Sequence, residues 1–188
     1  TRHFPIRGMD RRTFLKHSSA AGLLSLPGGG LVAAPADGPE PLAKTLSVHQ
    51  WQTLEKVQDH LLPSEPGAPG ARDVHATRYL DRTLADPKFD PEVKGFLLKG
   101  IGWLDELAED DEGKPFKDVE PAWREDLLIR ISQSSAGKNW LSTLISYTLE
   151  ALLADPLYGG NPGGIGWKWL EHDPGRPRPT ADKIYGKL

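Results

Sequence analysis

Four histidines lie in the part of the chain that has a globular composition, and their spacing does not favour a metal site. They are His49, His60, His75 and His172. His49 and His60 fall on about the same face of one predicted helix, but eleven residues of helix separate them by ~16 Å, too far for two ligands of one ion. No His-x-x-His, Glu-x-x-His or His-x-Glu pair occurs, and the chain has no cysteine. We therefore expect ordinary surface or capping histidines and no metal site.

The other patterns that could carry catalysis are also weak. Asp105-Glu106 and the acidic run at 109–112 end a predicted helix and enter a turn, with no apolar wall to raise a carboxyl pKa. No Gly-x-Ser-x-Gly elbow occurs. Residues 159–166 are as rich in glycine as a phosphate loop, but they lack Gly-Lys-Ser/Thr and follow a helix. Glycine there indicates positive φ or close backbone approach instead, and we expect no catalytic and no cofactor-binding residue in this chain.

Length and composition indicate one globular domain preceded by a short extra segment. The chain has 188 residues, of which 38% are apolar and 26% are charged, as is typical of globular proteins. The net charge of −3 is unevenly distributed, because residues 1–36 carry +4 and the remaining 152 residues carry −7. An acidic body does not bind nucleic acid by counterion release, so nucleic-acid partners are not expected.

The basic N-terminal segment resembles a twin-arginine (Tat) export signal. The residues that carry this pattern are Arg11, Arg12, Phe14, Leu15 and Lys16. A weakly apolar run over 18–34 follows, and then a small-x-small stretch that predicts cleavage after Ala36. Residues 1–8 precede Met9 as an N-terminal extension of the signal at 1–36, and 37–46 are a predicted linker. The alternative is a basic amphipathic first helix of the domain.

The body, residues 47–188, is predicted to be all-α. Ser47 and Gln50 form a capping box at the start of the first helix, and Pro63 ends it. Apolar residues recur at helical spacing over 47–62, 73–84, 91–107, 121–132 and 139–154, with an acidic turn at 109–113. No segment alternates with period two, so we expect no sheet. The predicted fold is an irregular bundle of about five helices.

A long glycine- and proline-rich tail begins at residue 156. It is too poor in helix formers to build its own core, so it must lie on the bundle or on a second chain. Trp51, Trp123 and Trp140 fall on apolar helix faces and are predicted to be core residues. Trp167 and Trp169 lie beside glycines, where two interpretations stay open: anchors at a protein interface, or packing back on the bundle.

The same tail carries a family resemblance. The run Asp155-Pro156-Leu157-Tyr158-Gly159-Gly160-Asn161, followed after four residues by Gly166-Trp167-Lys168, resembles the gluconate 2-dehydrogenase subunit 3 family. Thr148-Leu149-Glu150, His60-Leu61-Leu62-Pro63 and Pro174-Gly175-x-Pro177 extend the resemblance over about residues 47–180. The matching segment, with Trp169 beside it, supplies the residues expected at a partner interface: Tyr158, Gly159, Gly160, Asn161, Gly166, Trp167 and Trp169.

The resemblance implies a non-catalytic small (gamma) subunit of a membrane-bound sugar or sugar-acid dehydrogenase. The large subunit of such a complex is an FAD flavoprotein of the glucose–methanol–choline type, and a multihaem cytochrome c often completes it. The small subunit would hold no cofactor itself and would escort the flavoprotein through the Tat translocase. This places it in the periplasm, at the outer face of the cytoplasmic membrane through the complex. The alternative class is a stand-alone exported enzyme or ligand-binding module, and the proteins that co-purify with the chain discriminate the two.

Overall fold

A computed structural model of the protein describes residues 44–183, and within this range it contains six α-helices and no β-strand. The α-helices are α2 (Val48–Leu61), α3 (Ala76–Leu84), α4 (Pro91–Glu112), α5 (Pro121–Ser132), α6 (Ser135–Leu153) and α7 (Ile165–Leu170). Three single-turn 3-10 helices accompany them: η1 (Phe116–Asp118), η2 (Pro156–Tyr158) and η3 (Pro162–Gly164). The predicted all-α class is confirmed.

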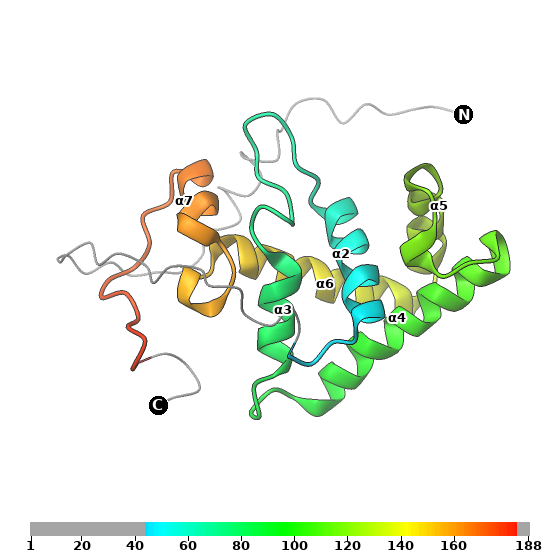
Figure 1. The fold of residues 1–188 in the computed structure, drawn as a ribbon, viewed down its shortest axis with the longest axis horizontal. Helices are drawn as coiled ribbons and strands as arrows, with labels where there is room; N and C mark the ends of the chain where they lie inside the picture. The colour runs from blue at the N-terminus through cyan, green and yellow to red at the C-terminus, as the bar shows by residue number, and fades with distance from the viewer. Residues whose placement is uncertain (1–43, 184–188) are drawn as a thin grey trace.

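Helix α6 is the central element of the molecule. It contacts each of the other five described α-helices. In Figure 1 it runs along the long axis, with α5 towards one end and α7 at the other. Only two of its 19 residues are charged, Lys138 and Glu150. A helix with so few charges can bury apolar side chains against several neighbours at once.

The main core lies between α2, α3, α4, α5 and α6, and Trp140 is its largest fully buried side chain. The Trp140 Nε1–H donates to the Leu97 carbonyl at 2.9 Å. The indole also lies on Gly100 of α4, where a Cβ atom would come within 2.2 Å of Trp140 Cδ1. Glycine in the middle of α4 therefore has a packing reason that outweighs its low helix propensity.

The helix termini set by local sequence signals are confirmed. Ser47 Oγ accepts the Gln50 backbone N–H at 3.1 Å, and the Gln50 side chain accepts the Ser47 N–H at 2.9 Å. This is the predicted capping box of α2. At α4, the Asp90 side chain caps the helix and Pro91 is the first helical residue. Both ends depend on residues within three positions of each other, so the sequence alone is sufficient to predict them.

Three helix boundaries differ from the prediction. Helix α4 continues through the acidic run to Glu112 and ends at Gly113, whose φ is 66°; its last carboxylates face solvent, and Asp111 pairs with Arg130 of α5. Helix α6 starts four residues early, because Ser134 caps it by accepting the Gly137 N–H at 2.9 Å. Helix α3 starts three residues late, after a turn in which His75 has a left-handed backbone.

The glycine-rich tail folds back on the bundle and completes a second, smaller core. This core joins the 62–76 loop, the end of α6 and α7 through buried apolar side chains: Leu62, Ala71, Val74, Ala76, Ala151, Leu152 and Leu170. No helix was expected in the tail, but α7 lies there, so this expectation is wrong. The helix was missed because it has only six residues and directly follows glycines. Of the two places expected for the tail, the structure has it on the bundle.

The tryptophans of the bundle were only partly predicted. Trp140 is buried as expected, and Trp51 is partly buried against the main core. Trp123 was predicted to be a core residue, but 54% of it is exposed. The buried face of α5 is instead formed by Leu127, Leu128 and Ile131. Apolar residues thus lie on more than one face of α5, and spacing alone could not identify the buried face.

The segment that joins the N-terminal region to α2 is held against α3. Asp81 is only 2% exposed, and its carboxylate accepts the backbone N–H groups of Lys44, Thr45 and Leu46 at 2.6, 2.9 and 2.8 Å. Leu46 is part of the main core. Residues 44–46, the end of the predicted linker, are therefore attached to the folded domain.

Candidate functional site

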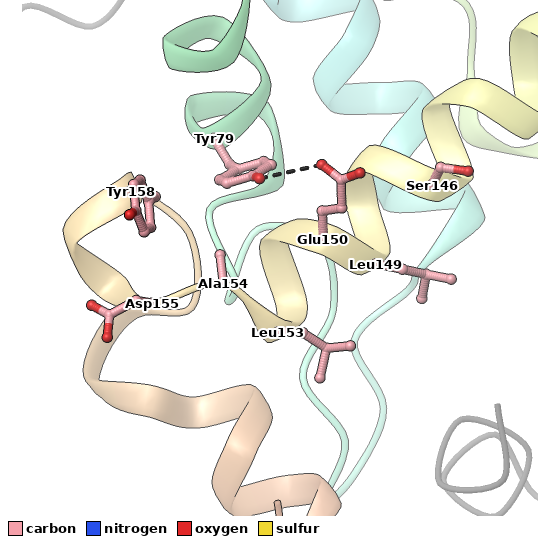
Figure 2. Close-up of a pocket in the computed structure, with 8 residues that line it drawn as sticks. All are labelled: Tyr79, Ser146, Leu149, Glu150, Leu153, Ala154, Asp155 and Tyr158. Atoms are coloured by element: carbon pink, nitrogen blue, oxygen red, sulfur yellow. Dashed lines mark hydrogen bonds between the residues drawn. The ribbon is translucent and has the colours of Figure 1, made fainter. Parts of the chain in front are cut away.

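An open pocket of about 530 Å³ lies beside the C-terminal half of α6 (Figure 2). Its wall is formed by α3, α6 and the start of the tail. The lining residues are Tyr79, Ser146, Leu149, Glu150, Leu153, Ala154, Asp155 and Tyr158. Four of them, Leu149, Glu150, Asp155 and Tyr158, belong to the runs that carry the family resemblance. The pocket is therefore the candidate functional site.

Glu150 and Tyr79 form the polar pair of this pocket. The Tyr79 hydroxyl donates to Glu150 Oε2 at 3.2 Å (Figure 2). Burial, then the nearby Glu150 charge and the hydrogen bond to it, raise the pKa of Tyr79 to about 12. Burial also raises the pKa of Glu150, although much of its side chain reaches solvent. The pair is thus an acceptor-rich, partly desolvated carboxylate held by a phenol.

A buried polar network sets the register of α3 against α6 and so positions this pair. The Thr77 hydroxyl donates to Gln58 Oε1 at 2.7 Å, and Gln58 Nε2 donates to Thr148 Oγ1 at 3.2 Å. All three side chains are buried. Thr77 precedes Tyr79 by two residues, and Thr148 precedes Glu150 by two. A satisfied network of this kind favours one alignment of the helices, which brings Tyr79 to Glu150.

The second carboxylate of the pocket, Asp155, is occupied by the tail. Its Oδ2 accepts Arg178 Nε–H at 2.9 Å, and its Oδ1 accepts the Leu157 N–H at 3.0 Å. The Arg178 guanidinium also lies over the Trp167 ring, 4.9 Å from the centroid. Arg178 therefore combines a carboxylate contact with an aromatic face, as the planar guanidinium allows.

Asn161 joins the tail to the bundle. It is completely buried and has a left-handed backbone, with φ 49° and ψ 52°. Its side chain donates to the Ala154 carbonyl at 3.0 Å and accepts the Gly166 N–H at 2.7 Å. Its backbone N–H donates to the Val74 carbonyl at 2.9 Å. Asparagine suits this position because it tolerates the left-handed region and has both a donor and an acceptor.

Trp167 packs against the same C-terminal end of α6. It is 8% exposed, and its Nε1–H donates to the Leu153 carbonyl at 2.8 Å, at the end of α6. Next to it, a Cβ atom on Gly166 would come within 2.0 Å of the Leu152 carbonyl oxygen. Close backbone approach therefore requires glycine at 166, as the sequence analysis proposed for this stretch.

The residues predicted for the partner interface differ in their surroundings. Tyr158 lines the pocket, and Trp169 packs partly buried against the second core. The remaining five are buried in the folded tail: Gly159, Gly160, Asn161, Gly166 and Trp167. Their role towards a partner stays a prediction, but the contacts that the structure shows for them hold the tail and one wall of the pocket in place.

Among the described residues, other groups that could have carried catalysis instead make contacts that hold the fold together. Asp105 was expected in a solvated acidic face, which is wrong. Its carboxylate is within 2.6 Å of His49 Nε2 and accepts the Phe116 N–H at 3.0 Å, because η1 folds back over α4. In the glycine-rich stretch at 159–166, the Gly164 N–H donates to the Asn161 backbone carbonyl, a hydrogen bond within the loop itself. Among residues 44–183, no three His, Cys, Asp or Glu side chains gather as a metal site would require.

The signal residues Arg11, Arg12, Phe14, Leu15, Lys16 and Ala36 lie outside the residues that the structure describes. None of the helices between residues 44 and 183 combines the length and the apolar composition that a membrane crossing requires.

Sequence reasoning missed the pairing at the centre of the pocket. Glu150 is marked in the sequence only as part of the family resemblance, and no sequence pattern points to Tyr79. The two residues are 71 positions apart, and no periodic pattern links them. A charged residue at position 150, in a helix with one other charge, was the only available signal.

The described residues thus form an all-helical domain whose candidate site is an open pocket with one wall formed by the start of the tail. The chain belongs to the gluconate 2-dehydrogenase subunit 3 family, whose model matches residues 48–175, more than half of the sequence. The resemblance in the tail is thereby confirmed, and the family name describes a subunit of a dehydrogenase. No curated protein and no solved structure matches the chain.

Proposed function

We propose that this chain is the non-catalytic small subunit of an FAD-dependent dehydrogenase complex that oxidises a CH–OH group of a sugar or sugar acid. The observation that carries the proposal is membership of a family named for the third subunit of gluconate 2-dehydrogenase. A third subunit implies at least two others. The FAD would reside in a large subunit of the glucose–methanol–choline type, and a multihaem cytochrome c is a further candidate subunit.

The chemistry of the candidate site supports a binding role. The pocket is open, is lined mainly by apolar and hydroxyl-bearing side chains, and holds one Glu–Tyr pair. A general base or acid must reach the reacting atom in a site that excludes water, and an open wall on a helix does not provide this. Such a surface suits a protein partner better than a small substrate.

The second part of the proposal is escort. The pattern Arg11-Arg12-x-Phe14-Leu15-Lys16 is that of a Tat signal, and this route transports folded proteins. A small subunit that bears the signal and binds the flavoprotein in the cytoplasm would carry it to the periplasm. The complex would then lie at the outer face of the cytoplasmic membrane.

The escort is tested by changing Arg11 and Arg12 together to lysine. This double variant keeps both charges but removes the planar guanidinium groups. We expect the small subunit and the FAD-containing subunit both to remain in the cytoplasmic fraction, with periplasmic dehydrogenase activity lost. The matched control changes Arg2 and Arg7 to lysine and should export normally.

Normal export of the flavoprotein in the Arg11→Lys, Arg12→Lys strain would contradict the escort role. Isolation of the chain as a monomer with its own activity, and with no flavoprotein partner, would instead favour a stand-alone module.

A further inference from the structure

Glu150 is the one anionic side chain of α6, and no described cation is recorded in contact with it. The recorded contact of its carboxylate is the Tyr79 hydroxyl, and among the described residues the groups that shift its pKa are burial and Tyr79. An ionised carboxylate has about four acceptor sites. Among the described residues, the Tyr79 hydroxyl uses only one of these acceptor sites.

The neighbouring carboxylate shows what completes such a site. Asp155 lines the same pocket and is bound by an arginine that also lies over an aromatic ring. Glu150 is also next to an aromatic residue, but its contact with Tyr79 is a hydrogen bond from the phenol hydroxyl, and no described arginine is recorded on it. The carboxylate of Glu150 accepts the Tyr79 hydroxyl and has no recorded contact with a described cation. Charge complementarity therefore points to a basic side chain as the group that this carboxylate can still bind.

The surface that surrounds Glu150 is apolar or neutral along the helix. From Lys138 to Glu150 helix α6 has no charged residue. Its outward side chains recur at helical spacing as Ser142, Ile145, Ser146, Leu149 and Leu153. Ile145 is 42% exposed. An uncharged strip of this kind, in a chain of which 26% is charged, is typical of an interface core with charges at its rim.

We propose that the α6 pocket is the docking site of the partner dehydrogenase subunit and accepts an arginine or lysine side chain of that subunit. The cation pairs with Glu150, the Tyr79 ring flanks it, and apolar partner side chains cover Leu149 and Leu153. Arginine fits best, because a guanidinium bonds a carboxylate in bidentate fashion and stacks on an aromatic face. This inference rests on the proposed function.

The test uses the full chain and the purified FAD-containing large subunit, with the dissociation constant measured by calorimetry. Glu150→Gln keeps an oxygen to accept the Tyr79 hydroxyl but removes the charge. We expect binding to weaken at least tenfold, and Glu150→Arg to weaken it further. The matched control is Glu125→Gln, the same change at an exposed position of α5, and it should alter affinity by less than about twofold, as surface changes do.

Three further readouts decide between outcomes. Both glutamine variants should show the wild-type circular dichroism melt, so that lost affinity reports the contact and not the fold. The salt dependence of binding should be shallower for Glu150→Gln than for the wild type, because one ion pair is gone. A photo-crosslinking phenylalanine derivative at Leu153 should attach to a partner peptide that contains arginine or lysine.

Wild-type affinity in Glu150→Gln, with the wild-type complex formed, overturns the docking site and leaves the proposed function standing. Loss of affinity in Glu125→Gln but not in Glu150→Gln overturns it in favour of the α5 surface. If the wild-type chain does not bind the FAD-containing subunit at all, the proposed function fails, and the inference fails with it.

Discussion

The two ends of the molecule carry tryptophans whose burial is the reverse of what their sequence surroundings indicate. Trp123 lies on the apolar pattern of α5 and is 54% exposed, whereas Trp167 of α7 follows a glycine-rich stretch and is 8% exposed. Figure 1 shows α5 and α7 towards opposite ends of the molecule. Helical periodicity identified the helix around Trp123 but not its buried face. The glycines near Trp167 hid a folded segment whose contacts come from α6. Burial therefore depended on the opposing surface rather than on the local segment.

Charge separates the same two regions. Residues 105–126 contain ten carboxylates and three cations, a net charge of −7, whereas the other described residues together have a net charge of +1. Asp111 finds a partner in Arg130, but most of the acidic side chains face solvent. Trp123 is exposed in this acidic region. At the α7 end, by contrast, Arg178 contacts Asp155 and the Trp167 ring of the same chain.

The largest effect expected from this comparison is on stability. Trp167→Ala removes a buried indole and leaves the Leu153 carbonyl without its donor, so we expect a loss of about 3–5 kcal/mol in the free energy of unfolding. Trp123→Ala, the matched change at the other end, should cost less than about 0.5 kcal/mol. Urea unfolding followed by circular dichroism measures both. Equal losses of unfolding free energy in Trp167→Ala and Trp123→Ala would contradict the difference in burial between the two tryptophans.

The next effect concerns the residue that holds the tail. Asn161→Ala removes a donor to the Ala154 carbonyl and an acceptor for the Gly166 N–H and places alanine at positive φ. We expect a loss of about 2 kcal/mol. Asn161→Asp keeps the acceptor and should lose less. Asn139→Ala, an exposed asparagine of α6, is the control, and an equal loss there would show that Asn161 is not special.

The smallest effect is a change in pH dependence. The pKa of Tyr79 is raised to about 12 from its ordinary 10.0, so the folded state holds this proton more tightly than the unfolded state. The stabilisation from this difference is complete below pH 10 and is lost as the pH rises towards 12. Tyr79→Phe should therefore flatten the fall of melting temperature over this range. If the melting temperature falls with pH in parallel for the wild type and Tyr79→Phe, the raised pKa of Tyr79 is contradicted.

Local signals in the sequence were sufficient to predict where α2, α4 and α5 begin. The capping box of Ser47 and Gln50, the Asp90-Pro91 start of α4 and the 121–132 helix follow from residues near each other in the chain. The tail motif was also sufficient to identify the family. Each of these features depends on backbone propensity, caps or a continuous run of residues, and so it can be read without knowing which segments meet.

Only the tertiary structure decided how the pocket is built. Glu150 meets Tyr79 across 71 residues, and the Asn161 side chain finds its donor and acceptor when the tail turns back on α6. The same holds for Trp123 and Trp167, since an apolar side chain is buried only where another element covers it. Periodicity states which side of a helix is apolar. Which apolar sides are covered, and which polar groups meet, depends on long-range packing that no single segment of the sequence contains.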